Sequence, residues 1–206
     1  SDWSSDVCSS DLFFSRKRNG TTTREDLADA LSDEEGLAQS FSPEERAMLA
    51  SILRMEDLRV EDLMVPRTDI ISVSQDITLA ELLKVFEDSG HSRMPVFDEN
   101  LDDPKGMIHI RDVVAYLTKA ATLTRAELAK RRKQAPSNLD LKKIDLDKPI
   151  GGLKLLREMM FVPPSMGARE LMARMQAERV QMALVIDEYG GTDGLVTLED
   201  IVEEID

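Results

Sequence analysis

The chain has 206 residues, with 26 Lys and Arg against 40 Asp and Glu, a formal charge of −14 and a hydrophobic content of 42%. This acidity excludes broad electrostatic binding to nucleic acid or anionic lipid, because that attraction requires clustered cations. A single Cys excludes an internal disulfide and a Cys-based zinc site, and no apolar run is long enough to span a bilayer. We therefore expect an acidic, cytoplasmic protein that has no nucleic-acid partner.

The first twelve residues, SDWSSDVCSSDL, carry the single Trp and the single Cys and show no apolar periodicity. This string resembles the translation of a sequencing-adapter read-through, so residues 1–12 are interpreted as foreign and left out of the fold argument. The alternative is a genuine Ser/Asp-rich terminus, and neither interpretation assigns it a function. Residues 13–20 hold two aromatics and three cations, too few charges for stable membrane anchoring, and are predicted to be flexible.

Two helices are predicted next in the chain. The first begins near Thr23 and has apolar residues on one face. The second begins with Ser42 as its N-cap and Pro43 at the first helical position, followed by two acidic residues in the first turn. Together these segments predict a small helical region ahead of the main body.

The rest of the chain repeats itself. HSRMPVFDE at 91–99 aligns with VQMALVIDE at 180–188, and GMIHIRD at 106–112 aligns with GLVTLED at 194–200. Each copy shows a strand, an amphipathic helix, two strands around a turn and a closing helix. The sequence therefore predicts an α+β fold of two strand-helix-strand-strand-helix units. They pack sheet against sheet, because about 60 residues alone bury too little surface.

The predicted elements occupy corresponding positions in the two copies. In the first copy they are strands at 70–73, 94–97 and 107–110 and a helix at 79–89. In the second copy they are strands at 161–162, 183–186 and 195–198 and a helix at 168–179. Between the copies, a basic stretch at Lys130–Lys133 lies on a predicted helix. A nucleic-acid or partner contact is one interpretation of it, and a solvated helix is the favoured one.

The segment GLVTLED joins a strand to a helix. Thr197 ends the strand and Asp200 lies in the first helical turn. Backbone amides at a helix N-terminus favour a phosphate, the Thr hydroxyl can donate to it, and a carboxylate suits a ribose diol. The alternative is that Thr197 and Asp200 only cap the helix. In the first copy His109 replaces the Thr, and because a His does not reproduce a small hydroxyl, one working site per pair is predicted.

The phrases MVPRTDI, GHSRMPVF and IDEYGGTDGLVTLEDIVEEI resemble a tandem cystathionine-β-synthase-type (CBS) domain pair, called a Bateman module. More narrowly, they resemble the module of the CorC/HlyC family, which is associated with magnesium and cobalt efflux. Family members continue into a further C-terminal domain, so we expect the chain to be truncated at both ends. The resemblance implies a helical N-terminal segment at 13–57, CBS domains at 58–117 and 149–206, and a linker at 118–148.

The resemblance also implies a site for ATP or AMP, with magnesium carried by the nucleotide phosphates and no direct metal ligand from the protein. Its Gly-x-x-Thr-x-x-Asp pattern falls on Thr197 and Asp200. Family geometry places further residues around the nucleotide: Thr68, Asp69 and Ile70 on one wall, Met182 and Ala183 on the other, and Arg93 near a phosphate. A surface ion pair is the alternative role for Arg93.

No motif for catalysis is present: the chain lacks a phosphate-binding Gly-Lys-Ser/Thr loop, a nucleophile elbow and a His-Glu-x-x-His pair. The resemblance therefore implies a regulatory module that forms a homodimer and acts beside a membrane transporter at the inner face of the plasma membrane. Two alternatives use the acidic runs Asp98–Asp103 and Glu199–Glu204. One is direct sensing of a divalent cation by carboxylates, and the other is hydrolysis of a nucleotide.

Overall fold

The computed structural model describes residues 20–32, 40–130 and 138–204. The predictions for residues 1–12, and for most of the basic stretch that begins at Lys130, lie outside these residues. The chain divides into two compact units at Arg54 and Met55, and each is described by itself. Within the described residues, no helix is both long enough and apolar enough to cross a membrane.

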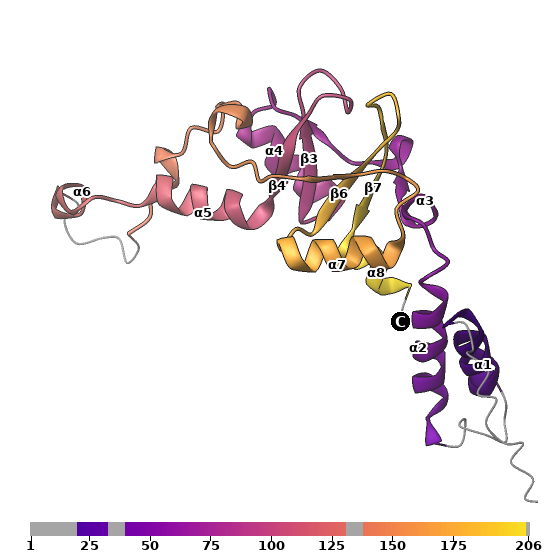
Figure 1. The fold of residues 1–206 in the computed structure, drawn as a ribbon. Helices are drawn as coiled ribbons and strands as arrows, with labels where there is room; N and C mark the ends of the chain where they lie inside the picture. Colours follow the sequence, from indigo (N-terminus) through magenta and orange to yellow (C-terminus); the bar gives the residue numbers. More distant parts are fainter. Residues whose placement is uncertain (1–19, 33–39, 131–137, 205–206) are drawn as a thin grey trace, which may run out of the picture. The chain divides into compact units, whose positions relative to one another are not determined.

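The first unit contains helices α1 (Gly20–Ser32) and α2 (Pro43–Arg54), which lie side by side (Figure 1). Helix α2 begins where the sequence predicts. The Glu45 amide donates to Ser42 Oγ at 3.2 Å, and the Ser42 amide donates to the Glu45 carboxylate at 2.7 Å. This reciprocal pair is a capping box, which satisfies two amides that the helix leaves without partners.

The second unit contains two β-sheets and confirms the α+β prediction. The three-stranded sheet has the order β2 (Val73–Ser74), β3 (Arg93–Phe97) and β4 (Pro104–His109). The four-stranded sheet has the order β1 (Val65–Pro66), β7 (Thr192–Thr197), β6 (Met182–Ile186) and β5 (Met160–Val162). Figure 1 shows the two sheets in the second unit, each with its own helices.

Helices connect and follow these strands in the same order in both copies. In the first repeat, α4 (Leu79–Ser89) joins β2 to β3 and α5 (Ile110–Ala121) follows β4. In the second repeat, α7 (Ala168–Glu178) joins β5 to β6 and α8 (Leu198–Glu203) follows β7. The remaining elements are short: α3 (Val60–Leu63), η2 (Arg67–Asp69), α6 (Arg125–Lys130), η3 (Leu141–Lys143) and η4 (Ile150–Gly152).

The strand register confirms the repeat residue by residue. Val73 pairs with Val96 in parallel, and Val162 pairs with Val185 in the same way. Each following hairpin is antiparallel, with a register shift directly after that second valine. Helix α4 matches its predicted bounds, with a capping box at its start and Gly90 in the left-handed conformation (φ 70°) at its end.

Several predicted boundaries differ from the structure, and three of them are strand boundaries in the repeats. The closing strands were expected to extend to Ile110 and Leu198, but these residues already begin α5 and α8, because His109 and Thr197 act as N-caps. The strand expected at 70–73 is wrong in extent: of these residues only Val73 pairs, together with Ser74. Upstream of Val73, Ile70 packs against a hydrophobic cluster, whereas Ile71 is exposed.

Each hairpin gains an additional neighbour from the segment that precedes the other repeat. Strand β1 pairs antiparallel with β7, with Val65 opposite Leu195. The linker does the same for β4, where Met107 and Arg157 exchange two backbone hydrogen bonds of 2.9 and 2.8 Å. The repeats are therefore joined by exchanged backbone pairing, which the local sequence pattern did not predict.

One hydrophobic cluster joins the repeats, and we call it the inter-repeat cluster. It comprises Met107, Met159, Met182, Leu184 and Leu195, with Ile70 and Ile186 packed against it. A second cluster fills the first repeat between α4 and its sheet. Because the inter-repeat cluster takes buried residues from both copies, it joins the two sheets in one core.

A group of polar contacts also links the copies, and we call it the clasp. Arg67 is ion-paired with Asp102 in the turn between β3 and β4, and its Nη1 donates to the Thr192 carbonyl at 3.1 Å. The Thr192 amide donates to Asp102 Oδ1 at 2.9 Å, and its hydroxyl donates to the Leu101 carbonyl at 2.6 Å. Thr192 is only 2% exposed, so these partners satisfy a buried polar side chain.

The clasp makes stability depend on pH through Asp102. The Arg67 guanidinium, and then the Thr192 amide, lower the pKa of the Asp102 carboxyl. Its contribution is therefore complete above the unfolded value of about 4 and is lost as the pH falls through the lower pKa of the folded state. Asp102→Asn is expected to have a lower Tm than the parent at pH 7, and the difference should disappear as the pH falls through the lowered pKa of Asp102. The control is Asp103→Asn, whose carboxylate pairs with Lys105 in the same hairpin; an equal pH-dependent difference there would contradict the assignment.

Candidate functional site

The corner between β7 and α8 holds Thr197 and Asp200, and we call it the Thr197 corner. The Asp200 amide donates to Thr197 Oγ1 at 3.2 Å. Asp200 Oδ2 accepts from both the Thr197 amide and the Thr197 hydroxyl, each at 2.8 Å. The capping role considered from the sequence is therefore present. It leaves Asp200 Oδ1 without a hydrogen bond to any described residue, so that this oxygen can accept from a ligand hydroxyl.

The Thr197 corner lies beside the inter-repeat cluster. Met182 is the cross-strand partner of Thr197, and the two side chains share a face of the sheet because cross-strand partners do so. Met182 belongs to the cluster, against which Ile70 also packs. Ala183 is buried, but strand alternation turns its side chain to the opposite face. The structure thus places Met182 beside the corner, packs Ile70 against the same cluster, and points the Ala183 side chain away.

Thr68 and Asp69 lie toward the other end of β7. They belong to η2, are exposed, and hydrogen-bond to each other at 3.3 Å. Since β1 runs antiparallel to β7, the chain moves away from Thr197 as it passes from β1 into η2, and Arg67 contacts Thr192 at the first position of β7. Of the three residues predicted to form this wall, only Ile70 packs against the inter-repeat cluster.

Arg93 reaches from the first repeat to the second. It is the first residue of β3, and its Nη1 donates to Glu199 Oε1 in α8 at 3.0 Å. The sequence left two roles open for Arg93, a phosphate contact and a surface ion pair, and the structure contains the ion pair. The Glu199 side chain is 75% exposed, whereas that of Arg93 is 18% exposed. Glu199 is therefore solvated when it leaves Arg93, and a phosphate can replace it as the partner of the guanidinium.

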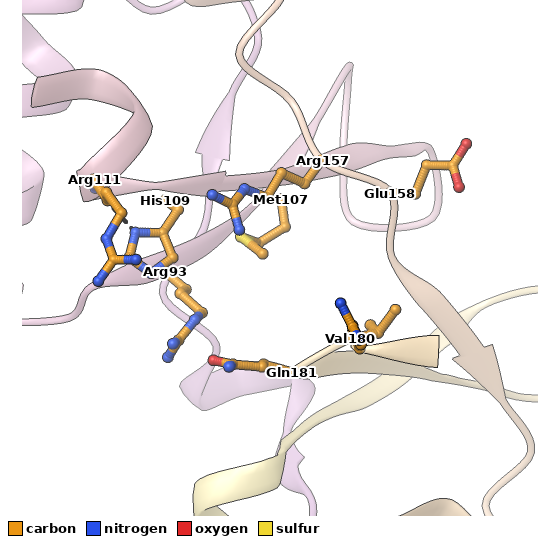
Figure 2. Close-up of a pocket in the computed structure, with 9 residues that line it drawn as sticks. Arg93, Met107, His109, Arg111, Arg157, Glu158, Val180 and Gln181 are labelled. Carbon is orange, nitrogen blue, oxygen red and sulfur yellow. Dashed lines mark hydrogen bonds between the residues drawn. The ribbon is translucent and has the colours of Figure 1, made fainter. Parts of the chain in front are cut away.

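A separate cavity of about 260 Å³ lies between the closing strand of the first repeat and the start of β6. Figure 2 shows the guanidinium groups of Arg93 and Arg157 on the same side as His109, while the Glu158 carboxylate points away from them. We call it the arginine cavity after the four arginines that line it together with His109: Arg93, Arg111, Arg157 and Arg179.

His109 is the N-cap of α5, and its Nδ1 accepts from the Arg111 amide at 2.9 Å. Burial lowers the pKa of the imidazole, and the charges of Arg93 and Arg157 lower it further, against a smaller opposing effect from Asp112. His109 is therefore neutral at pH 7, with its proton on Nε2, because Nδ1 is an acceptor. As predicted, it does not present a hydroxyl where the second copy has Thr197.

Most of the residues that line the arginine cavity were not predicted from the sequence. Arg111 corresponds to Glu199 in the repeat, so a reversal of charge between the copies was the available signal. Arg157 gave no signal, because its place opposite Met107 follows from the exchanged backbone pairing. Arg157 forms a two-pronged ion pair with Asp112, at 2.5 and 2.8 Å, which lowers the pKa of the Asp112 carboxyl.

The acidic runs offer no assembled cation site within the described residues. Asp102 belongs to the clasp, Glu199 pairs with Arg93, and Asp200 caps α8. No group of three or more His, Cys, Asp or Glu in the part of the chain that the structure describes could hold a metal ion. The direct cation sensor therefore gains no support from the geometry.

The family model for the CBS domain matches residues 60–119 and 152–206, one match on each repeat. The chain belongs to the CBS-domain family. Two solved structures with this fold are CBS domains of the bacterial CNNM/CorC family Mg²⁺ transporter. One is 30% identical, with a TM-score of 0.66, and covers 88% of this chain and 94% of that one. The other, in complex with ATP, is 30% identical, with a TM-score of 0.61, and covers 79% and 97%.

A CBS-domain pair with bound AMP from Klebsiella pneumoniae is 28% identical, with a TM-score of 0.51, and covers 72% of this chain and 98% of that one. Among curated relatives, the possible hemolysin C of Rickettsia akari is 38% identical over 81% of this chain and 47% of its own length. The magnesium and cobalt efflux protein CorC of Vibrio cholerae is 30% identical over 88% and 53%. The chain thus spans about half the length of these relatives, and the predicted CBS pair of the CorC/HlyC type is confirmed.

Proposed function

We propose that this CBS pair is a regulatory module that binds ATP or AMP, with magnesium on the phosphates, and serves a CorC-like protein in magnesium and cobalt efflux. The solved relatives with bound ATP and bound AMP support an adenine nucleotide as the ligand. The name of the Vibrio cholerae relative supports the role in efflux. Catalysis is not part of this proposal. Its partners are a second copy of the module and a membrane transporter, at the inner face of the plasma membrane.

The Thr197 corner carries the proposal. Asp200 Oδ1 has no hydrogen-bond partner among the described residues and lies beside a half-buried Thr hydroxyl. Met182, the cross-strand partner of Thr197, packs in the inter-repeat cluster, and a few polar groups beside apolar residues are typical of small-molecule sites. The ribose diol would donate to the carboxylate, and the ring would contact these apolar residues.

The signal would pass through the contacts between the repeats. Arg93 of the first repeat is held by Glu199, next to Asp200. A phosphate near the Thr197 corner would attract Arg93 and release Glu199, which changes a contact that joins the copies. A ligand that prefers one arrangement of the repeats shifts the population toward that arrangement, and a partner domain can read the difference.

Calorimetric titration with ATP and AMP, with and without magnesium, tests this function. Asp200→Ala is expected to weaken nucleotide binding at least tenfold, because it removes the acceptor for the ribose. The matched control is Glu81→Ala, which breaks the same kind of capping box at α4. It should leave the affinity unchanged while lowering stability by a similar amount.

Thermal unfolding of both variants shows whether weaker binding arises in a folded protein or only because the variant has unfolded. Unchanged affinity in a folded Asp200→Ala variant would move the site away from the Thr197 corner. Binding of magnesium alone, with no binding of either nucleotide, would favour the direct cation sensor over the nucleotide module.

A further inference from the structure

We propose that an apolar groove beside the turns of the two hairpins is a docking site for the segment Phe13–Arg18 of the same chain. We call it the hairpin groove, after the β3–β4 and β6–β7 turns that border it. This surface is separate from the Thr197 corner and does not depend on the proposed function. The proposal rests on the exposed aromatic residues at the groove, on the charge of the turns and on the composition of the segment.

The hairpin groove has a volume of about 350 Å³ and an apolar lining: Pro104, Phe161, Val162, Pro163, Ile186 and Gly190. Gly190 belongs to the turn that leads into Thr192, the first residue of β7. The groove therefore lies at the opposite end of β7 from the Thr197 corner. All six residues belong to the second unit, with Pro104 in the first repeat and the other five in the second.

Two aromatic side chains are exposed at this surface. Phe161, in the edge strand β5, is 50% exposed, and Tyr189, next to Gly190, is 91% exposed. The turn that carries Tyr189 is held by Asp187, whose Oδ1 accepts from the amides of Tyr189 at 2.9 Å and Gly191 at 2.8 Å. A fixed, exposed aromatic side chain beside an apolar groove is typical of a surface that binds a polypeptide.

The two turns beside the groove are acidic. Residues 98–103 contain four carboxylates, residues 187–193 contain three, and neither range contains a Lys or Arg. Arg67 pairs with one of these carboxylates and Lys105 with another, and the other five make no ion pair with a described residue. Figure 1 shows both turns at the same end of the second unit, and the clasp joins them. This negative charge favours an occupant that carries several cations.

The segment Phe13–Arg18, FFSRKR, combines apolar and cationic residues and lies outside the described residues. Its two phenylalanines can pack against Phe161 and Tyr189, and its three consecutive cations can pair with the acidic turns. The chain has one other run of three or more cations, Lys130–Lys133, and no aromatic residue flanks it. A segment of the same chain also binds at a high effective concentration, so modest contacts are sufficient.

Spin labelling tests this docking in the whole chain. The single Cys of the sequence, Cys8, precedes the segment and accepts a nitroxide label. In the parent, the label is expected to broaden the NMR signals of the groove amides, those of Phe161, Ile186 and Gly190. The internal reference is the amide of Gly90, which ends α4 just before β3 and so lies at the other end of the hairpin from the turns. Equal broadening at Gly90 and at the groove would overturn the proposal, as would no broadening at the groove.

Two further samples complete this experiment. The labelled double variant Phe13→Ser/Phe14→Ser should lose the broadening at the groove, and unchanged broadening would overturn the proposal. In a mixture, spin-labelled chains are combined with isotope-labelled chains that carry no spin label. No broadening is expected there, and broadening would overturn the assignment of the segment to the same chain.

Binding of a separate peptide gives a second readout. A synthetic peptide of residues 13–20 is titrated into the Phe13→Ser/Phe14→Ser chain, whose own segment no longer competes. Phe161→Ser and Tyr189→Ser, each added to that chain, should weaken peptide binding about tenfold, as expected for aromatic anchors. Because both side chains are exposed, these variants should keep the fold, which circular dichroism checks. The matched control is Leu141→Ser, at a side chain that is 73% exposed and does not line the groove. Unchanged affinity in both groove variants, or equal weakening by the control, would overturn the proposal.

Discussion

Gly194→Ala is expected to destabilise the second unit by about 2–3 kcal/mol, in the range for overpacking of a closely packed site. A Cβ at Gly194 would lie 2.6 Å from Met64 Sδ and 2.6 Å from the Val65 carbonyl oxygen. The sulfur can move with its side chain, but the carbonyl belongs to the β1–β7 pairing and cannot. The added methyl group would therefore push β1 off β7.

Gly106→Ala should have a similar effect at the related position of the first repeat. Its Cβ would lie 2.6 Å from the Arg157 carbonyl oxygen, and its φ of 151° adds backbone strain for any residue with a Cβ. Urea unfolding measures both variants. The control is Gly152→Ala, whose Cβ meets no atom within 4 Å and should change stability by less than about 0.5 kcal/mol. A parent-like midpoint for Gly194→Ala would mean that β1 does not dock on β7 in solution.

Leu184→Ala is expected to cost about 2–5 kcal/mol, the range for a large aliphatic side chain removed from a core. Leu184 has no exposed surface and lies in the inter-repeat cluster. Its loss leaves a cavity between two sheets that backbone pairing holds in place, so the site cannot collapse readily. Because the cluster joins both copies, unfolding should remain a single transition at a lower urea concentration.

The matched control for this second prediction is Leu141→Ala, whose side chain is 73% exposed and should matter little. Two separate unfolding transitions in Leu184→Ala would contradict this expectation, because they would mean that the clasp and the exchanged strands, which the variant retains, do not by themselves couple the repeats. Nucleotide affinity in this variant is a further measure, because Met182, beside the Thr197 corner, packs in the same cluster.

Local sequence patterns predicted the elements whose stability is local. Helix α4 begins and ends at its predicted residues because Thr78 caps its start and Gly90 its end. Helix α2 likewise begins at Ser42 and Pro43. The same local chemistry explains the strand ends that were extended too far, since His109 and Thr197 are both strand residues and helix caps.

Contacts between distant segments were not predictable in this way. Strand β1 forms against a strand more than a hundred residues later in the chain, and no periodicity in two residues signals it. The same exchange sets Arg157 opposite Met107 and so completes the arginine cavity. It also carries Thr68 and Asp69 toward the beginning of β7, a placement that the resemblance to the family did not suggest.

By itself, the sequence determined the internal repeat, the α+β class, the CBS family and the pair Thr197 and Asp200 at one corner. The repeat and the class follow from aligned segments and local periodicity, the pair from motif spacing, and the family from the resemblance of its motifs. Only the tertiary structure decided which segments the two repeats exchange, how Arg93 is paired, and that four arginines surround one cavity. Those outcomes depend on backbone pairing and burial between residues that are far apart in the chain. The free energies of these long-range contacts cannot be predicted from a local sequence pattern.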